Sequence, residues 1–273
     1  MESQANENAL LQRIESLENW LRLAEAFHSG GFWMLMDRIE EQSLGSRQIA
    51  CIVCGFEGGL GDFKMHEDEC IFDGGKLRRM ECPKCDCIFG PMKYLDLDDD
   101  FVSQDYALLY SGYSEGDSTD NEVHAFRTLS PSVALGKKYL NWGVGGAWSR
   151  TMQTLRGEGF DVWGYEPSIP HSSEYVVRTK AEISGKFSGI VSNNVIEHFR
   201  KPVDEFLYFS EILDEDGTMV HQSPCYEYSH AFTRFHTLFL LGKSPHVLAE
   251  RTGFTAVRAV PGKDTLSYLF KKA

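Results

Sequence analysis

The sequence has no apolar run long enough to cross a membrane, and it is short of positive charge. No stretch approaches the roughly 20 apolar residues that a spanning helix needs, and no basic segment followed by an apolar run opens the chain. Lysine and arginine number 27 against 40 acidic residues, a net charge of -13. A nucleic-acid phosphate surface needs clustered cations. The sequence therefore predicts a cytoplasmic protein with no membrane span and no nucleic-acid partner.

The chain has enough apolar material for a full core. Of its 273 residues, 42% are hydrophobic and 12% aromatic, which predicts one large domain with accessory segments. We expect four parts along the chain, which are a helical segment (1–46), a zinc-ribbon-like module (47–94), a linker or lid (95–128) and a large α/β domain (129–273).

Cysteines occur in a pattern typical of a metal site. Two CxxC pairs, Cys51–Cys54 and Cys82–Cys85, are separated by 27 residues. Each CxxC turn can present two thiolates to one tetrahedral ion, and four thiolates close the site to substrate. The spacing predicts a structural zinc ion on these four residues. Cys87, Cys70 and His66 remain possible substitute ligands, and buried cysteines without metal remain the alternative.

A glycine-rich turn between a strand and a helix is the most specific feature of the sequence. We expect a strand at 138–142, a turn that contains Gly143, Gly145 and Gly146, and a helix that ends near Arg156. A second strand, at 160–164, is followed by Glu166. Such a β-α-β unit is typical of nucleotide binding.

The residues around this turn favour one class of nucleotide. Glycines allow the backbone to approach a ligand closely, and an acidic residue 21 positions after Gly145, Glu166, can accept hydrogen bonds from ribose hydroxyls. A dinucleotide motif requires a third glycine where this chain has Trp148. NAD and FAD are therefore disfavoured. S-adenosylmethionine (SAM) carries adenosine without pyrophosphate and is the expected cofactor.

Three later segments carry a family resemblance. Residues 186–202 (KFSGIVSNNVIEHFRKP), 212–224 (ILDEDGTMVHQSP) and 246–257 (HVLAERTGFTAV) follow the turn in order. Together with it, they resemble class I SAM-dependent methyltransferases. The resemblance implies an α/β fold with a seven-stranded sheet in the order 3-2-1-4-5-7-6. The expected strands are 138–142, 160–164, 175–178, 188–193, 218–222, 254–260 and 265–271, with a turn at 261–264 before the last.

The resemblance also implies a cofactor site at the carboxyl ends of the strands. Its residues would be Asn141, Gly143, Gly145, Gly146, Glu166, Asn193 and Asn194. The chain departs from the family pattern at three positions. Asn141 replaces the usual acidic residue, Ala147 the usual third glycine of GxGxG, and Ser188 the usual aspartate of the fourth strand.

The reaction implied is attack of a substrate atom on the sulfonium methyl group. A hydroxyl nucleophile needs a base, and His198 follows the fourth strand where the family places residues near the methyl group. A structural role for His198 is the alternative. His221, His230 and His236 are weaker candidates, and Cys225 is expected to be inert.

Two flanking segments have less specific interpretations. Leu10, Ile14, Leu17, Leu21 and Ala24 form a heptad seam on a helix expected to stop at Ser29-Gly30-Gly31, which favours either a homodimer or packing on its own domain. Residues 106–113 (YALLYSGY) are either a cofactor lid or core.

The substrate prediction rests on a second resemblance. Methyltransferases that act on nucleotide-linked sugars also carry a zinc ribbon before the SAM domain, and residues 51–91 are similar to theirs. This resemblance implies a small-molecule or saccharide substrate, with a sugar hydroxyl favoured. A non-catalytic binding or scaffold protein that keeps the SAM fold is the alternative.

Overall fold

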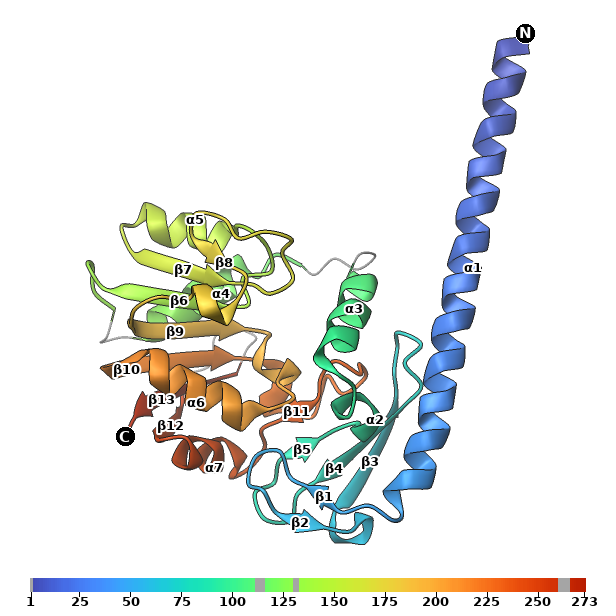
Figure 1. Ribbon diagram of the computed structural model, residues 1–273. Helices are drawn as coiled ribbons and strands as arrows, with labels where there is room; N and C mark the ends of the chain where they lie inside the picture. The colour runs from blue at the N-terminus through green and yellow to red at the C-terminus, as the bar shows by residue number, and fades with distance from the viewer. Residues whose placement is uncertain (1, 111–115, 130–132, 260–265) are drawn as a thin grey trace.

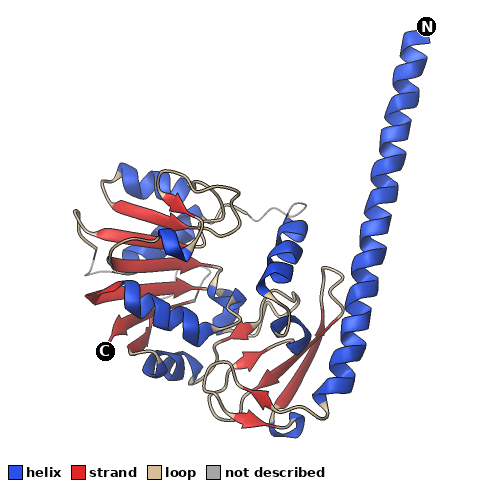
Figure 2. Ribbon diagram, in the orientation of Figure 1, coloured by secondary structure: helices blue, strands red, loops and turns tan. Residues whose placement is uncertain are grey.

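The computed structural model describes residues 2–110, 116–129, 133–259 and 266–273 (Figure 1). It contains a long N-terminal helix, a small antiparallel sheet and a larger sheet with helices on both faces (Figure 2). Four single 3-10 turns join these elements: η1 (Leu60–Asp62), η2 (Lys180–Glu182), η3 (Ile196–His198) and η4 (Pro224–Tyr226).

The larger sheet has seven strands. They are β6 (Lys138–Trp142), β7 (Asp161–Tyr165), β8 (Val176–Val177), β9 (Phe187–Asn193), β10 (Leu213–Gln222), β12 (Phe254–Arg258) and β13 (Ser267–Lys272). Their order across the sheet is β12-β13-β10-β9-β6-β7-β8. The strands from β8 to β10 are parallel, and β13 runs antiparallel to both β10 and β12. The turn expected at 261–264 lies outside the described residues.

Alternating side chains on the central strands build the two faces of this sheet. Tyr139, Val191 and Val220 join the cluster under α4 (Thr119–Thr128) and α5 (Arg150–Gly157), while their neighbours Leu140, Ile190 and Met219 join the cluster that also contains α6 and α7 residues. Successive strand residues point to opposite faces of the sheet, so each of these strands is buried on both faces. The second pair of helices is α6 (Pro202–Ile212) and α7 (Ser244–Arg251). The carboxyl ends of β6, β7 and β9 therefore form one edge between two helical layers.

The smaller sheet combines distant parts of the chain. Its strands are β3 (Lys64–Glu69), β4 (Lys76–Glu81), β5 (Ile88–Phe89) and β11 (Leu238–Phe239), in the order β11-β5-β4-β3. A separate ribbon pairs β1 (Ile49–Ala50) with β2 (Glu57–Gly58). Because β11 comes from the segment between β10 and α7, the cysteine-containing module extends beyond the 47–94 range expected from sequence. The module and the large sheet also share one apolar cluster.

A buried arginine of the small sheet holds the loop that precedes β11. Arg79 of β4 is fully buried, and its guanidinium donates to the main-chain carbonyls of Ala231 and Thr233 at 2.6 Å and of His236 at 3.0 Å. Burying a guanidinium is costly unless its N–H groups are satisfied. These carbonyls satisfy Arg79 and fix the loop against the module.

The N-terminal helix is longer than the sequence predicts. Helix α1 runs from Glu2 to Leu44 and passes through Gly30 and Gly31, so the expected stop at these glycines was wrong. A glycine inside a helix costs about 1 kcal/mol relative to alanine. Docking of the last part of α1 compensates, since Trp33 is buried against Tyr94 and Phe235. Within the described residues, no helix has the length and apolar character needed to cross a membrane.

Helices α3 (Asp99–Tyr110) and α4 occupy most of the 95–128 segment that we expected to be a linker or lid. A shorter helix, α2 (Met92–Leu95), ends where this segment begins. Tyr106 of α3 places its ring edge-on to Phe235, with centroids 5.3 Å apart, and to His198 at 5.8 Å. Tyr113, at the end of the YALLYSGY segment, lies outside the described residues.

Candidate functional site

The glycine turn after β6 has a backbone conformation that other residues rarely adopt. Gly143 and Gly145 have φ values of +80° and +77°. A Cβ atom on Gly143 would lie 2.5 Å from Cγ2 of Val195, a contact no side chain can make. Gly145 faces open space. Gly143 thus permits close packing of the turn on the segment after β9, and Gly145 leaves room for a ligand.

Glu166 lies directly opposite this turn. The Gly145 N–H donates to Oε2 of Glu166 at 2.7 Å, and Oε1 accepts from the N–H and the hydroxyl of Ser168 at 3.1 and 2.6 Å. Glu166 as a whole is 7% exposed. Two carboxylate oxygens together offer about four acceptor positions. Glu166 is therefore fixed at the end of β7 and keeps capacity to accept a ribose hydroxyl.

Asn141 is paired with an acidic residue that sequence reasoning missed. The buried Asn141 amide on β6 donates to Oε2 of Glu122 at 3.3 Å, and Oε1 of Glu122 accepts from the Ser118 hydroxyl at 2.5 Å. Glu122 lies in the first turn of α4. A carboxylate therefore lies beside the position where the family has an acid on the strand. The acidic first turn of a helix was visible in the sequence, but its contact with Asn141 was not.

Asn193 and Asn194 end the neighbouring strand, β9. The Oδ1 atom of Asn193 accepts from Nε2 of Gln222 at 2.6 Å. Asn194 has a φ of +54° and its N–H donates to the Gln222 carbonyl at 2.9 Å. Asparagine tolerates this left-handed conformation better than most residues. Both asparagines lie at the same edge as Gly143 and Glu166, because β9 and β7 flank β6.

His198 lies in η3, just beyond this edge. Its Nδ1 is 3.1 Å from the Phe235 carbonyl, and its ring centroid is 5.1 Å from that of His236. Burial lowers the pKa of His198 to about 4 and that of His236 to about 3, because a charged ring would lose its hydration. Both imidazoles are therefore neutral at neutral pH. The proximity of His236 could not be read from the sequence, since 37 residues separate the two.

The side chains of the other candidate residues make separate contacts. His221 is fully buried on β10, where its Nδ1 lies 2.7 Å from the Ser192 hydroxyl. His230 is exposed and its Nδ1 lies 3.0 Å from the Ser229 hydroxyl. Cys225 is buried, and burial raises the pKa of its thiol, which keeps it protonated and unreactive.

The four cysteines expected to bind zinc meet at one point. Their Sγ atoms all lie within 4.8 Å of one another, with 3.6 Å between Cys51 and Cys85 and 3.5 Å between Cys54 and Cys82. Four sulfurs at about 2.3 Å from one ion would be roughly 3.8 Å apart in a regular tetrahedron. The residues present therefore fit a zinc ion.

The proposed substitute ligands have other contacts. His66 lies 2.8 Å from Glu81, and the Cys70 sulfur accepts from Arg234 at 3.7 Å. Cys87 is buried and contacts Cys51 and Cys85 from outside the group of four.

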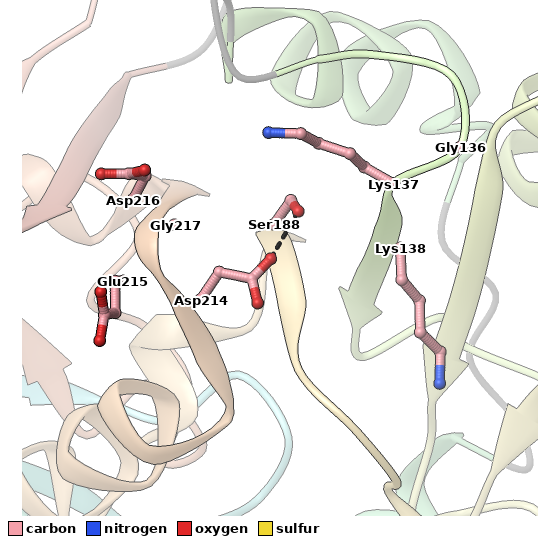
Figure 3. Close-up of a pocket in the computed structure, with 8 residues that line it drawn as sticks. All are labelled: Gly136, Lys137, Lys138, Ser188, Asp214, Glu215, Asp216 and Gly217. Atoms are coloured by element: carbon pink, nitrogen blue, oxygen red, sulfur yellow. Dashed lines mark hydrogen bonds between the residues drawn. The ribbon is translucent and has the colours of Figure 1, made fainter.

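A surface hollow of about 400 Å³ lies at the opposite edge of the sheet (Figure 3). It is lined by residues from the amino ends of β6 and β9 and from the first half of β10, including Ser188, whose hydroxyl donates to Asp214 at 2.7 Å. Figure 3 shows that the side chains of Lys137 and Lys138, which both line this hollow, extend in different directions. Neither the glycine turn nor Glu166 lines it. The hollow is therefore unrelated to the cofactor site.

Comparison with known families concerns the segment that carries the glycine turn and Glu166. Residues 124–257, which are 134 of the 273, match the family model for a methyltransferase domain. This match, over just under half of the chain, supports a methyltransferase domain. The matched residues include every expected cofactor-binding position and His198. Comparison with curated proteins gives no match.

Several solved structures are similar to part of the chain. One is the mycolic acid cyclopropane synthase CmaA1 complexed with SAH and CTAB, at 20% identity over 51% of this chain and 61% of that chain, with a TM-score of 0.37. A second is the cyclopropane synthase MmaA2 from Mycobacterium tuberculosis, at 18% identity over 60% and 73%, with a TM-score of 0.37. A third is the N-methyltransferase NodS from Bradyrhizobium japonicum WM9, at 13% identity over 56% and 94%, with a TM-score of 0.42. The chain thus spans less than two thirds of the CmaA1 chain.

Proposed function

We propose that the protein transfers a methyl group from SAM to a small molecule or saccharide, with a sugar hydroxyl as the favoured acceptor. The observation that carries this proposal is the contact between the Gly145 N–H and the Glu166 carboxylate at the edge where the strand order reverses. It lies within the segment that matches a methyltransferase domain. We expect the activity in the cytoplasm.

The cofactor would bind across the glycine turn. Glu166 accepts the ribose hydroxyls at the end of β7, and Gly143, Gly145 and Gly146 let the backbone approach the ligand. Asn193 and Asn194 form the other wall at the end of β9. When bound, SAM supplies an activated methyl group, so the residues of the chain act mainly by positioning the acceptor for in-line attack.

Glu122 would provide the negative charge that Asn141 lacks. The SAM methionine group carries an ammonium, which an acid on the first strand holds in the related enzymes. Here the Asn141 amide donates to Glu122 at 3.3 Å, so the carboxylate is anchored next to that position from the helix side. This arrangement favours cofactor binding over the scaffold alternative. The scaffold alternative is supported by Asn141 and Ala147, which depart from the family pattern.

A hydroxyl acceptor requires that its proton be removed, and His198 is the base that we propose. Its Nδ1 lies 3.1 Å from the Phe235 carbonyl, so this nitrogen carries the proton of the neutral ring and Nε2 can accept one. Burial holds its pKa near 4, so the free base is present at neutral pH.

The four cysteines would hold a structural zinc ion. Each knuckle repeats the same backbone pattern, in which the first cysteine N–H donates to the carbonyl five residues on, to Phe56 at 2.9 Å and to Cys87 at 2.8 Å. The residues after the second cysteines, Gly55 and Asp86, both have positive φ. Two matched turns that present four sulfurs leave no open position for a substrate.

The exposed seam on α1 would form a homodimer contact. Leu10, Ile14, Leu17 and Leu21 are between 43% and 61% exposed. Figure 1 shows this half of α1 extending away from the rest of the protein, so its own domain does not cover the seam. A second copy of the same helix offers a matching heptad face.

Calorimetric titration with SAM separates the enzyme from the scaffold. We expect micromolar binding, followed by transfer of label from tritiated SAM to a member of a panel of nucleotide-sugars, glycans and small phenols. Absence of SAM binding would favour the scaffold protein, and binding without transfer to any acceptor would leave the sugar hydroxyl unsupported.

A further inference from the structure

Glu197, His198 and His236 converge at one point between the two sheets, where η3 contacts β11. One carboxylate oxygen and two imidazole nitrogens lie within 4.8 Å of one another. We propose that these three side chains bind one divalent transition-metal ion, at a site separate from the four cysteines. Two imidazoles and one carboxylate are a ligand set that binds such ions and leaves coordination positions open.

The separation of the ligand atoms is close to what an ion needs. Imidazole nitrogens and carboxylate oxygens bind such ions at about 2.0 to 2.2 Å, which places neighbouring ligands roughly 3 to 4 Å apart. The three candidate ligand atoms all lie within 4.8 Å of one another, so an ion that binds them would draw them together by rotation of the side chains.

Both histidines are held in the tautomer that binds metal. Nδ1 of His198 lies 3.1 Å from the Phe235 carbonyl, and Nδ1 of His236 lies 2.7 Å from the His230 carbonyl. A carbonyl only accepts hydrogen bonds, so each Nδ1 carries a proton and each neutral ring presents its Nε2 lone pair. A backbone carbonyl that orients the second ring nitrogen is the usual companion of a metal-binding histidine.

The carboxylate is fixed in a similar way. Oε2 of the buried Glu197 accepts from the Ser223 hydroxyl at 2.7 Å. The main-chain carbonyl of Glu197 accepts from the N–H of Thr237 at 2.8 Å. This bond joins the segment that carries Glu197 and His198 to the segment that carries His236. Arg79 holds the carbonyl of His236 from the small sheet. All three ligands are therefore oriented by neighbours before any ion binds.

An ion here would change how a hydroxyl acceptor is activated. A hydroxyl that binds the open position of the ion ionises more readily, its oxygen staying on the ion and its proton passing to solvent water. In the loaded protein His198 serves as a ligand instead of a proton acceptor. This consequence rests on the proposed methyl transfer, whereas binding of the ion does not.

The test is a titration of the full-length, zinc-containing protein with Mn²⁺, followed by the electron paramagnetic resonance signal of the free ion in the absence of SAM. We expect one Mn²⁺ per wild-type chain. His236→Ala should weaken binding by at least the roughly 10- to 100-fold that loss of an outer partner costs. His230→Ala removes a histidine from the same loop but keeps the carbonyl that orients His236, and should bind as the wild type does.

A second variant guards against a folding defect in His236→Ala. Glu197→Gln keeps the size of the side chain and an acceptor for Ser223, removes the charge, and should also weaken Mn²⁺ binding at least tenfold. Unchanged thermal unfolding and cysteine-bound zinc would show that both variants are folded. Wild-type protein that takes up no Mn²⁺, or equal affinity in wild type, His236→Ala and Glu197→Gln, would overturn the proposal. Since SAM is absent, neither result depends on whether the protein binds its cofactor.

Discussion

Replacing Glu122 by glutamine tests whether a helix supplies the charge missing from the first strand. The change keeps the shape and an acceptor for the Asn141 amide, which lies 3.3 Å away, but removes the negative charge. An ammonium about 4 Å from a carboxylate gains about 4 kcal/mol at an effective dielectric constant near 20. Desolvation of both groups reduces the net value to about 1.5 to 3 kcal/mol.

We therefore expect Glu122→Gln to raise the SAM dissociation constant by about 10- to 150-fold, since each 1.4 kcal/mol is a factor of ten. Calorimetry with SAM measures this change directly. The matched ligand is 5′-methylthioadenosine, which has the adenosine but lacks the amino acid chain, and its affinity should stay the same. Asp120→Asn removes an exposed charge from the same turn of α4 and serves as the control variant.

Two outcomes would refute the reasoning about Glu122. One is unchanged SAM affinity in Glu122→Gln, which would mean that the Glu122 carboxylate does not bind the ammonium of SAM. The other is an equal loss for SAM and for 5′-methylthioadenosine, which would mean that the variant disturbs the adenosine site through Ser118 or the glycine turn. A loss confined to SAM would support the proposed contact.

Four further predictions address the other parts of the protein. Glu166→Ala should weaken SAM and 5′-methylthioadenosine alike, by about 1 to 3 kcal/mol in a calorimeter, because both carry the ribose diol; unchanged affinity would place the ribose elsewhere. Elemental analysis should find one zinc per chain on Cys51, Cys54, Cys82 and Cys85, and chelation should destabilise that module before the large domain; metal-free protein of full stability would contradict this. His198→Ala should cut turnover by about 10²- to 10⁴-fold with SAM affinity nearly intact. The wild-type rate should rise with pH through the ionisation near pH 4, since only the unprotonated ring accepts a proton; a profile that survives the mutation would exclude this role. Leu17→Glu with Leu21→Glu should convert a dimer to a monomer in sedimentation, and a wild-type monomer would remove the basis of the dimer proposal.

Features encoded by residues close together in the chain could be predicted from the sequence. The glycine turn and Glu166 belong to one β-α-β unit, and their contact follows from two parallel strands that end at the same edge. The CxxC pairs each set two sulfurs in one turn, so only the meeting of two turns had to be assumed. In both cases the residues of the expected site lie in short local motifs, so few contacts between distant segments had to be predicted.

Contacts between distant segments could not be predicted. Glu122 precedes Asn141 by 19 residues across a part of the chain without a recognisable motif. His236 reaches His198 only because β11 pairs with β5 and Arg79 holds the preceding loop. The stop expected at Gly30 and Gly31 failed for a related reason, since the local cost of glycine was outweighed by the docking of Trp33 against residues far along the chain.

The cysteine module is connected to the candidate site through the small sheet. Cys82 directly follows the strand that carries Arg79, and Cys85 precedes the strand that pairs with β11. A zinc ion that joins the two knuckles would hold β4 and β5 in register, and through Arg79 and β11 it would hold the loop that brings His236 to His198. Loss of zinc from the cysteines should accordingly loosen the loop that holds His236 next to His198, although the effect does not depend on contact between cysteines and histidines. A zinc ion in a site that is closed to substrate would in this way still fix the position of the proposed base, His198.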